Sequence, residues 1–333
     1  MMDKKLLYVS HSPHIRHADS TRTIMADIII ALIPALVWAI YIFGARVLTV
    51  TAVSVISCVA GEALFCVIAR KPQTSGDLSA VVTGILLAYT LPAAVPLWMP
   101  CVGGLFASVV VKQCFGGIGK NIFNSVAASR VLLSLFPAAE LYSNPFENLP
   151  LIENVPDGTP LVSEAIYALK DGIIPQIPMF DMFIGNCVGG IGTVSGLLIL
   201  AGGIYLAARK IISLRIPLSF IIAAGTFVYI FPHNSSKEEY MIYHLLSGGL
   251  ILCAVFIATD FSTSPLSGTG KIIFGAGCGI LSMLLRYTGT EGVYIAVIIM
   301  NAFTRFLDEV TLPRPFGKVS VSPAKDRETE KKE

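Results

Sequence analysis

Ten apolar segments, each long enough or nearly long enough to cross a lipid bilayer, constrain this chain more than any other feature of its sequence. A spanning helix needs about 20 mostly apolar residues, and the shorter segments are those expected of tilted, broken or buried spans. The chain is 54% hydrophobic and 14% charged, whereas soluble domains carry about 25% charged residues. We therefore predict an all-α integral membrane protein with about ten transmembrane helices, at Ile24–Phe43, Val47–Ala69, Leu78–Ala94, Leu97–Val111, Ile122–Phe136, Phe183–Ala208, Ile216–Phe231, Ile242–Thr259, Ile272–Leu285 and Val293–Thr304.

The distribution of Lys and Arg predicts that both termini are cytoplasmic. With that orientation, nineteen basic residues fall in the inner segments, Lys112 among them, and Arg130 lies within a span. The outer segments hold four basic residues, Arg46, Lys170, Lys237 and Arg286. This asymmetry agrees with the positive-inside rule. The basic residues are scattered through short loops and the net charge is +2, so no nucleic-acid partner is expected.

A long acidic loop divides the predicted spans into two groups of five. The predicted organisation is a cytoplasmic N-terminal segment (1–23), a first five-helix half (24–136), an outer loop (137–182), a second five-helix half (183–304) and a cytoplasmic tail (305–333). The two halves cross the membrane in opposite directions, as two inverted repeats do when they form a site where they meet. The two halves also share a short sequence similarity that is consistent with a repeat: Asn121-Ile122-Phe123 in the first half and Asn301-Ala302-Phe303 in the second.

Two ionisable residues lie well inside predicted spans. Glu62 and Arg130 are costly in lipid and are therefore candidates for a functional role. The residues alone leave two interpretations open, a structural pair and a place on an ion path. Three carboxylates at inner helix ends, Asp77, Asp260 and Asp308, are interpreted as exposed boundary residues.

Three glycine clusters interrupt the apolar segments, at 116–119, 185–192 and 275–279. Glycine lets helices or a flat ligand approach closely, so both helix packing and a cofactor cleft remain open. The seven cysteines lie in apolar stretches without metal-site spacing and are interpreted as small buried residues. His11, His14 and His17 lie in a polar N-terminal segment, where no metal site is expected. No catalytic acid–base pair or nucleophile is evident.

The outer loop contains the sequence Pro156-Asp157-Gly158-Thr159-Pro160-Leu161. Asp-Gly favours a turn, and Pro160 favours an extended conformation at Thr159. On these residues alone the segment is a plain turn that presents a threonine hydroxyl.

Several motifs in order along the chain are similar to those of the NqrB/RnfD family of membrane subunits. They are Ser12-Pro13-His14, Met25 through Pro34, Ser79 to Gly84, Lys112-Gln113 with Gly116 to Asn124, Ala258-Thr259-Asp260 with Thr263-Ser264-Pro265, Glu291-Gly292 and Met300-Asn301. They cover the chain from near its N-terminus to about Asp308. The family includes subunits of Rnf ferredoxin:NAD oxidoreductases and of sodium-pumping NADH:quinone reductases. The length of the N-terminal region favours the RnfD branch.

The resemblance implies a subunit that carries FMN, joined by a phosphoester to a threonine, and a non-covalent riboflavin. In the family this threonine follows Ser/Thr-Gly-Ala and often precedes Pro-Leu; here the matching position is Thr159, preceded by Pro156-Asp157-Gly158 and followed by Pro160-Leu161. Implied partners are the other Rnf subunits in a hetero-oligomer, membrane lipid, and a flavin transferase for maturation. The implied location is the bacterial cytoplasmic (inner) membrane.

The implied function is electron relay between ferredoxin-side and NAD-side partners, coupled to movement of Na⁺ or H⁺. Three alternatives remain: an NqrB-type quinone reductase subunit, a solute transporter or channel of inverted-repeat architecture, and a scaffold subunit without redox function.

Overall fold

The computed structural model describes residues 20–136 and 168–312, apart from 176, 187–188, 194, 234–235 and 289–291. His11, His14, His17 and Thr159 lie outside the described residues, so the predictions made for them rest on sequence. Within the described part the chain is all-helical, with one isolated β-bridge between Pro92 and Gly190.

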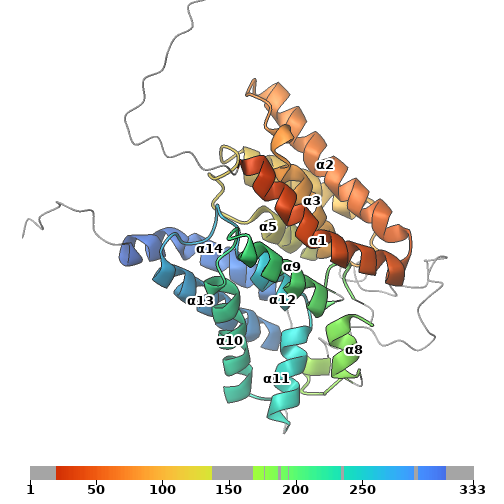
Figure 1. The fold of residues 1–333 in the computed structure, drawn as a ribbon, viewed down its shortest axis with the longest axis vertical. Coiled ribbons are helices and arrows are strands. Elements are labelled where there is room, and N and C mark those ends of the chain that lie inside the picture. The colour runs from red at the N-terminus through yellow and green to blue at the C-terminus, as the bar shows by residue number, and fades with distance from the viewer. Residues whose placement is uncertain are drawn as a thin grey trace, which may run out of the picture.

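The first half contains α1 (Thr21–Phe43), α2 (Arg46–Ile68), the 3₁₀ turn η1 (Ser75–Asp77), α3 (Ser79–Tyr89), α4 (Trp98–Leu105), which continues as the π-helix η2 (Phe106–Gln113), and α5 (Ser125–Ser134). The second half contains α8 (Met179–Ile184), α9 (Gly196–Ala208), α10 (Arg215–Ile230), α11 (Lys237–Leu246), α12 (Leu250–Leu252), which continues as the π-helix η3 (Cys253–Ile257), α13 (Gly268–Tyr287) and α14 (Gly292–Thr311). Figure 1 shows the first half in red to yellow and the second in green to blue.

Three described helices are long and apolar enough to cross a membrane alone: α1, α2 and α13, with mean hydropathies of 2.3, 2.0 and 1.5. A fourth span is possible if α11 and residues 250–257, bent by 61° at their break, count as one. Shorter apolar helices are α3, α5, α9 and α10. Within the described residues the fold is therefore helical, with three long apolar helices, or four if the bent pair is taken as one span.

Two of the predicted spans are not single helices. The predicted helix Phe183–Ala208 is wrong because α8 ends at Gly185, whose φ is 100°, and α9 begins only at Gly196. The predicted helix Ile242–Thr259 is broken where Gly248 and Gly249 adopt φ values of 61° and 69°. Glycine can adopt a left-handed backbone that ends a helix at little cost. An apolar pattern gives no sign of such a helix end.

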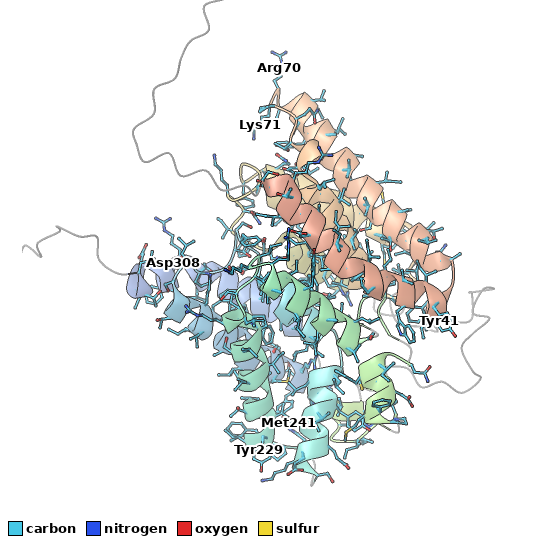
Figure 2. The ribbon with its side chains drawn as sticks, viewed as in Figure 1. Tyr41, Arg70, Lys71, Tyr229, Met241 and Asp308 are labelled. Carbon is cyan, nitrogen blue, oxygen red and sulfur yellow. The ribbon has the colours of Figure 1, made fainter. Side chains whose placement is uncertain are left out.

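The outward faces of the long helices carry large apolar side chains. On α1 these include Ile33, Val37 and Tyr41, and α2 and α10 expose similar rows. Contiguous apolar surface of this extent suits acyl chains rather than water. Figure 2 places Arg70, Lys71 and Asp308 toward the upper and left side of the molecule, and Tyr41, Tyr229 and Met241 toward the lower and right side.

Helices from the two halves pack against one another at two places. Helix α1 packs against α9, and α5 packs against α14. Between them lie two short buried helices, α3 and the α12–η3 segment. Residues with left-handed backbone precede each, Leu78 before α3 and Gly249 before α12. Each is followed by a threonine whose hydroxyl donates to a carbonyl of the last turn, Thr90 to Leu87 at 2.7 Å and Thr259 to Val255 at 2.5 Å.

Candidate functional site: a cavity where the halves meet

A cavity of about 770 Å³, its open mouth included, lies between the start of α3, the end of η3 and the start of α5. The apolar part of its wall includes Met25 and Ile28 from α1, Leu206 from α9 and Phe256 from η3. Its lining is that of ligand pockets in general, which are mostly apolar with a few placed polar groups. The cavity therefore has the lining of a site for a small organic molecule.

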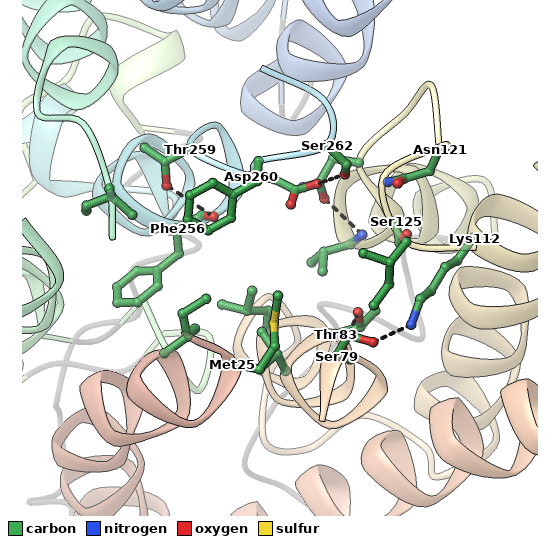
Figure 3. A pocket seen from close by; sticks show the side chains of 18 of the residues that line it. Met25, Ser79, Thr83, Lys112, Asn121, Ser125, Phe256, Thr259, Asp260 and Ser262 are labelled. Atoms are coloured by element: carbon green, nitrogen blue, oxygen red, sulfur yellow. Dashed lines mark hydrogen bonds between the residues drawn. The ribbon is translucent and has the colours of Figure 1, made fainter. Parts of the chain in front are cut away.

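The polar groups of the cavity lie at its two opposite ends. Figure 3 shows Ser79, Thr83 and Lys112 at one end, and Asn121, Asp260 and Ser262 at the other. A wider groove lined by Ile118, Asn121, Asp260 and Ser262 continues from this second end toward Arg305 and Asp308 on α14. The second end therefore adjoins the surface, on the side where Asp308 lies in Figure 2.

Asn124 joins the two halves at this site. Its side-chain oxygen accepts from the backbone of Val126 and Ala127 at 3.0 and 3.1 Å and so caps α5. Its amide donates to the Ile257 carbonyl at 3.0 Å, at the end of η3. One side chain thus fixes the start of a first-half helix against the end of a second-half helix.

The three inner carboxylates are not freely exposed, contrary to the sequence interpretation. All are half-buried. Asp260 accepts from the Ser262 hydroxyl at 2.8 Å, Asp77 from the Ser79 hydroxyl at 2.6 Å, and Asp308 from the Leu266 backbone at 2.9 Å. Each carboxylate is thus held by a hydroxyl or backbone donor from a neighbouring segment, which the residue pattern does not predict.

Glu62 is fully buried on α2 and forms an ion pair with Lys112 at 2.8 Å. Its second oxygen accepts from Gln113 at 2.9 Å and from Thr74 at 2.5 Å. The ammonium of Lys112 also donates to the Ser79 hydroxyl at 2.5 Å. Lys112 was predicted to lie in an inner loop; this is wrong, because the π-helix η2 extends the helix past Val111 and turns Lys112 and Gln113 toward Glu62.

The ion-pair partner of Glu62 is Lys112 and not Arg130, so of the two interpretations left open by the sequence, a direct pair between Glu62 and Arg130 does not hold. Arg130 is buried on α5, and its guanidinium lies 5.8 Å from the ring centroid of Tyr294 on α14. A cation over an aromatic face is attractive. Arg130 therefore contributes to the contact between the halves rather than to the Glu62 network.

Two charged groups at the joins between elements were missed by the sequence reasoning. Asp27 on α1 pairs with Arg209 after α9 at 2.9 Å and accepts from Tyr205 at 2.9 Å. Arg286, predicted to lie in an outer loop, is buried in the last turn of α13. It donates to the carbonyls of His244 and Ser247 at 2.6 and 2.8 Å, across the break before α12.

The glycine clusters divide between the two interpretations. In 275–279, a side chain at Gly275 would lie 2.6 Å from the Ile216 carbonyl, so this cluster packs α13 on α10. In the glycine segment, residues 185–195, Ile191 and Gly192 donate to the carbonyls of Leu91 and Tyr89 at 2.9 and 3.0 Å. The cluster 116–119 forms a left-handed turn beside the cavity.

Cysteines and metal ligands add no second site in the described part of the chain. Cys58, Cys66, Cys253 and Cys278 are buried as predicted, whereas Cys114 is exposed. Among the residues placed by the structure, no group of His, Cys, Asp and Glu side chains could hold a metal ion.

Comparison with known proteins decides the family. Residues 8–317 match the NQR2, RnfD, RnfE family. The chain belongs to this family. It is 39% identical over 325 residues to a subunit of the Na⁺-translocating ferredoxin:NAD⁺ oxidoreductase complex of Acetobacterium woodii, covering 96% of this chain and 98% of the relative. The family predicted from the sequence motifs is confirmed.

Two further relatives show the same full-length similarity. The corresponding subunit of the proton-translocating ferredoxin:NAD⁺ oxidoreductase complex of Clostridium ljungdahlii is 33% identical over 321 residues, covering 94% of this chain and 97% of the relative. That of the ion-translocating oxidoreductase complex of Stutzerimonas stutzeri is 33% identical over 331 residues, covering 90% of this chain and 93% of the relative.

Proposed function

We propose that this chain is the flavin-carrying membrane subunit of an ion-translocating ferredoxin:NAD oxidoreductase complex. The observation that carries the proposal is the near-complete match to one and the same subunit of several such complexes. In this role the chain relays electrons between the ferredoxin-side and NAD-side partners, and the relay is coupled to Na⁺ or H⁺ movement. The other subunits of the complex are its partners, and the bacterial cytoplasmic membrane is its location.

The proposed topology has ten crossings in two inverted five-helix repeats, 24–136 and 183–304, with both termini cytoplasmic. Matched features of the two halves support it. Leu78-Ser79 at the start of α3 corresponds to Leu246-Ser247 shortly before α12. A buried cation from the next long helix contacts each serine, Lys112 at Ser79 and Arg286 at Ser247. The placement of Arg70 and Asp308 toward one side, and of Tyr41 and Tyr229 toward the other, also agrees.

The proposed cofactors are FMN, joined by a phosphoester to Thr159 in the outer loop 137–182, and riboflavin, held without a covalent bond in the inner cavity. The cavity residues fit a flavin: the apolar lining, which includes Ile28 and Phe256, suits the ring system, and Asn121 and Ser125 offer amide and hydroxyl groups to its polar edge. A bound flavin supplies one- and two-electron chemistry, while the protein orients it and sets its electrostatics.

The residues of the chain have separate tasks in this proposal. Asn124 holds the two halves at a fixed separation, which keeps the cavity walls in place. Leu206, Met25 and Ile28 exclude water from the apolar side. A flavin transferase is the partner required to attach FMN to Thr159.

The test is flavin content, with and without the threonine. Intact mass of the purified chain should show one added FMN, and flavin fluorescence should stay with the denatured chain on a gel. Thr159→Ala should abolish both signals but leave extractable riboflavin in the complex. Ser163→Ala, a hydroxyl removed four residues away, is the matched control and should retain the covalent flavin. A wild-type chain without any flavin would contradict the proposal and favour a solute transporter or channel.

A further inference from the structure

Lys112 places a positive charge at the wall of the inner cavity, beside a carboxylate that compensates it. Lys112 and Glu62 are both buried, with side-chain exposures of 5% and 0%. The ammonium is shared between Glu62 and the hydroxyl of Ser79, and both Ser79 and Lys112 line the cavity. Figure 3 shows the two side chains joined at one end of the cavity, next to Thr83.

The Glu62 carboxylate is held in place by more than its ion pair. Gln113 and Thr74 donate to the oxygen that Lys112 does not contact. If the ammonium turned away, these two neutral donors would still fix the carboxylate. The lysine side chain is a point charge on a flexible four-carbon stem, so it can change partner without movement of the backbone.

The other charged groups in and beside the cavity are negative. Asp77 on η1 accepts from the Ser79 hydroxyl at 2.6 Å, and Asp260 lies at the opposite end. Among the described residues that line the cavity, Lys112 is therefore the one that carries a positive charge. In a low-dielectric interior, the energy of a new negative charge depends strongly on such a group.

We propose that Lys112 is the charge-compensating residue for negative charge on the molecule held in the inner cavity, and that Glu62 is the counter-ion that limits its strength. This inference rests on the proposed function, in which that molecule is a flavin. Lys112 favours the reduced, electron-rich form of the flavin relative to the oxidised form. Glu62 opposes this preference by neutralising the ammonium.

The test is the midpoint potential of the non-covalent flavin in the purified complex, measured by redox titration of its visible absorption. Lys112→Gln should weaken the preference for the reduced form at least tenfold, which lowers the potential by about 59 mV for a one-electron couple. Glu62→Gln should shift the potential in the opposite direction. Both substitutions retain hydrogen-bonding groups of similar size at these positions.

Two further variants separate a charge effect from a structural one. Lys112→Arg keeps the charge and should restore a potential near that of the wild type. Lys120→Gln removes an exposed lysine from the loop that follows η2 and should leave the potential unchanged, because solvent screens it.

Equal potentials in the wild type, Lys112→Gln and Glu62→Gln, or shifts of the same sign in both variants, would overturn the inference. Flavin content is measured in every preparation. A wild-type complex without non-covalent flavin contradicts the proposed function itself, whereas bound flavin with an unaltered potential in both variants contradicts only the role of Lys112.

Discussion

Arg286 should be one of the largest single contributors to the stability of the second half. Its guanidinium donates to the His244 carbonyl at 2.6 Å and to the Ser247 carbonyl at 2.8 Å. Two longer bonds, each of 3.3 Å, reach the Gly248 carbonyl and the Ser247 hydroxyl. Together they satisfy carbonyl groups that lose their helical hydrogen bonds where the helix breaks between α11 and α12. Inside a membrane these carbonyls would have no water to bond.

The magnitude follows from these four bonds. Side-chain hydrogen bonds between membrane helices contribute about 0.6 kcal/mol on average and up to about 1.7 kcal/mol. With the upper value for the two short bonds and the mean for the two long ones, Arg286→Met should lower the free energy of unfolding by about 4–5 kcal/mol. Arg286→Lys keeps the charge but has a single ammonium, so we expect roughly half of that loss.

Equilibrium unfolding in mixed detergent micelles, followed by circular dichroism, measures these differences. Arg305→Met is the control: Arg305 is 92% exposed and its pair with Glu309 spans 3.5 Å, so its removal should cost no more than about 0.5 kcal/mol. If Arg286→Met unfolded within about 1 kcal/mol of the wild type, the reasoning that the break needs its guanidinium would be refuted.

Two smaller effects should be seen in the same assay. Gly192→Ala places a methyl group against the ring of Tyr89 and should cost about 1–3 kcal/mol, whereas Gly76→Ala, with open space around the added carbon, should change stability by less than about 0.5 kcal/mol. Equal losses for the two glycines would contradict the close contact. Asp27→Asn breaks the pair with Arg209, but because that arginine side chain is 53% exposed the loss should stay below about 1 kcal/mol; a loss of about 3 kcal/mol would mean that the pair is shielded from water.

The helices could be predicted from the sequence where the apolar run and the helix coincide. The segments Ile24–Phe43 and Val47–Ala69 agree with α1 and α2 to within a few residues. Hydropathy reports only how apolar a stretch is, so it does not distinguish a straight helix from one that is interrupted. Hydropathy therefore predicted one continuous span where the left-handed backbone of Gly248 and Gly249 interrupts the helix.

The site was less predictable than the fold because its charges meet through contacts far apart in the sequence. Glu62 was found as a candidate, but its partner Lys112 is 50 residues away on a π-helix. A single basic residue after an apolar run looks the same in the sequence whether that residue lies in a loop or its side chain turns into the protein. The family motifs did contain the site: Lys112-Gln113, Asn124 and Asp260 all lie in those motifs and all contribute to the cavity or its wall.

The short length of α3 has a consequence for how membrane voltage acts on this protein. Ser79 lies at the inner cavity and Tyr89 at the contact with the glycine segment, so a helix of 11 residues separates the two, about 16 Å at 1.5 Å per residue. That is roughly half of a 30 Å hydrocarbon layer. A unit charge carried along the membrane normal over this length would do about 1.2 kcal/mol of electrical work per 100 mV, half of a full crossing.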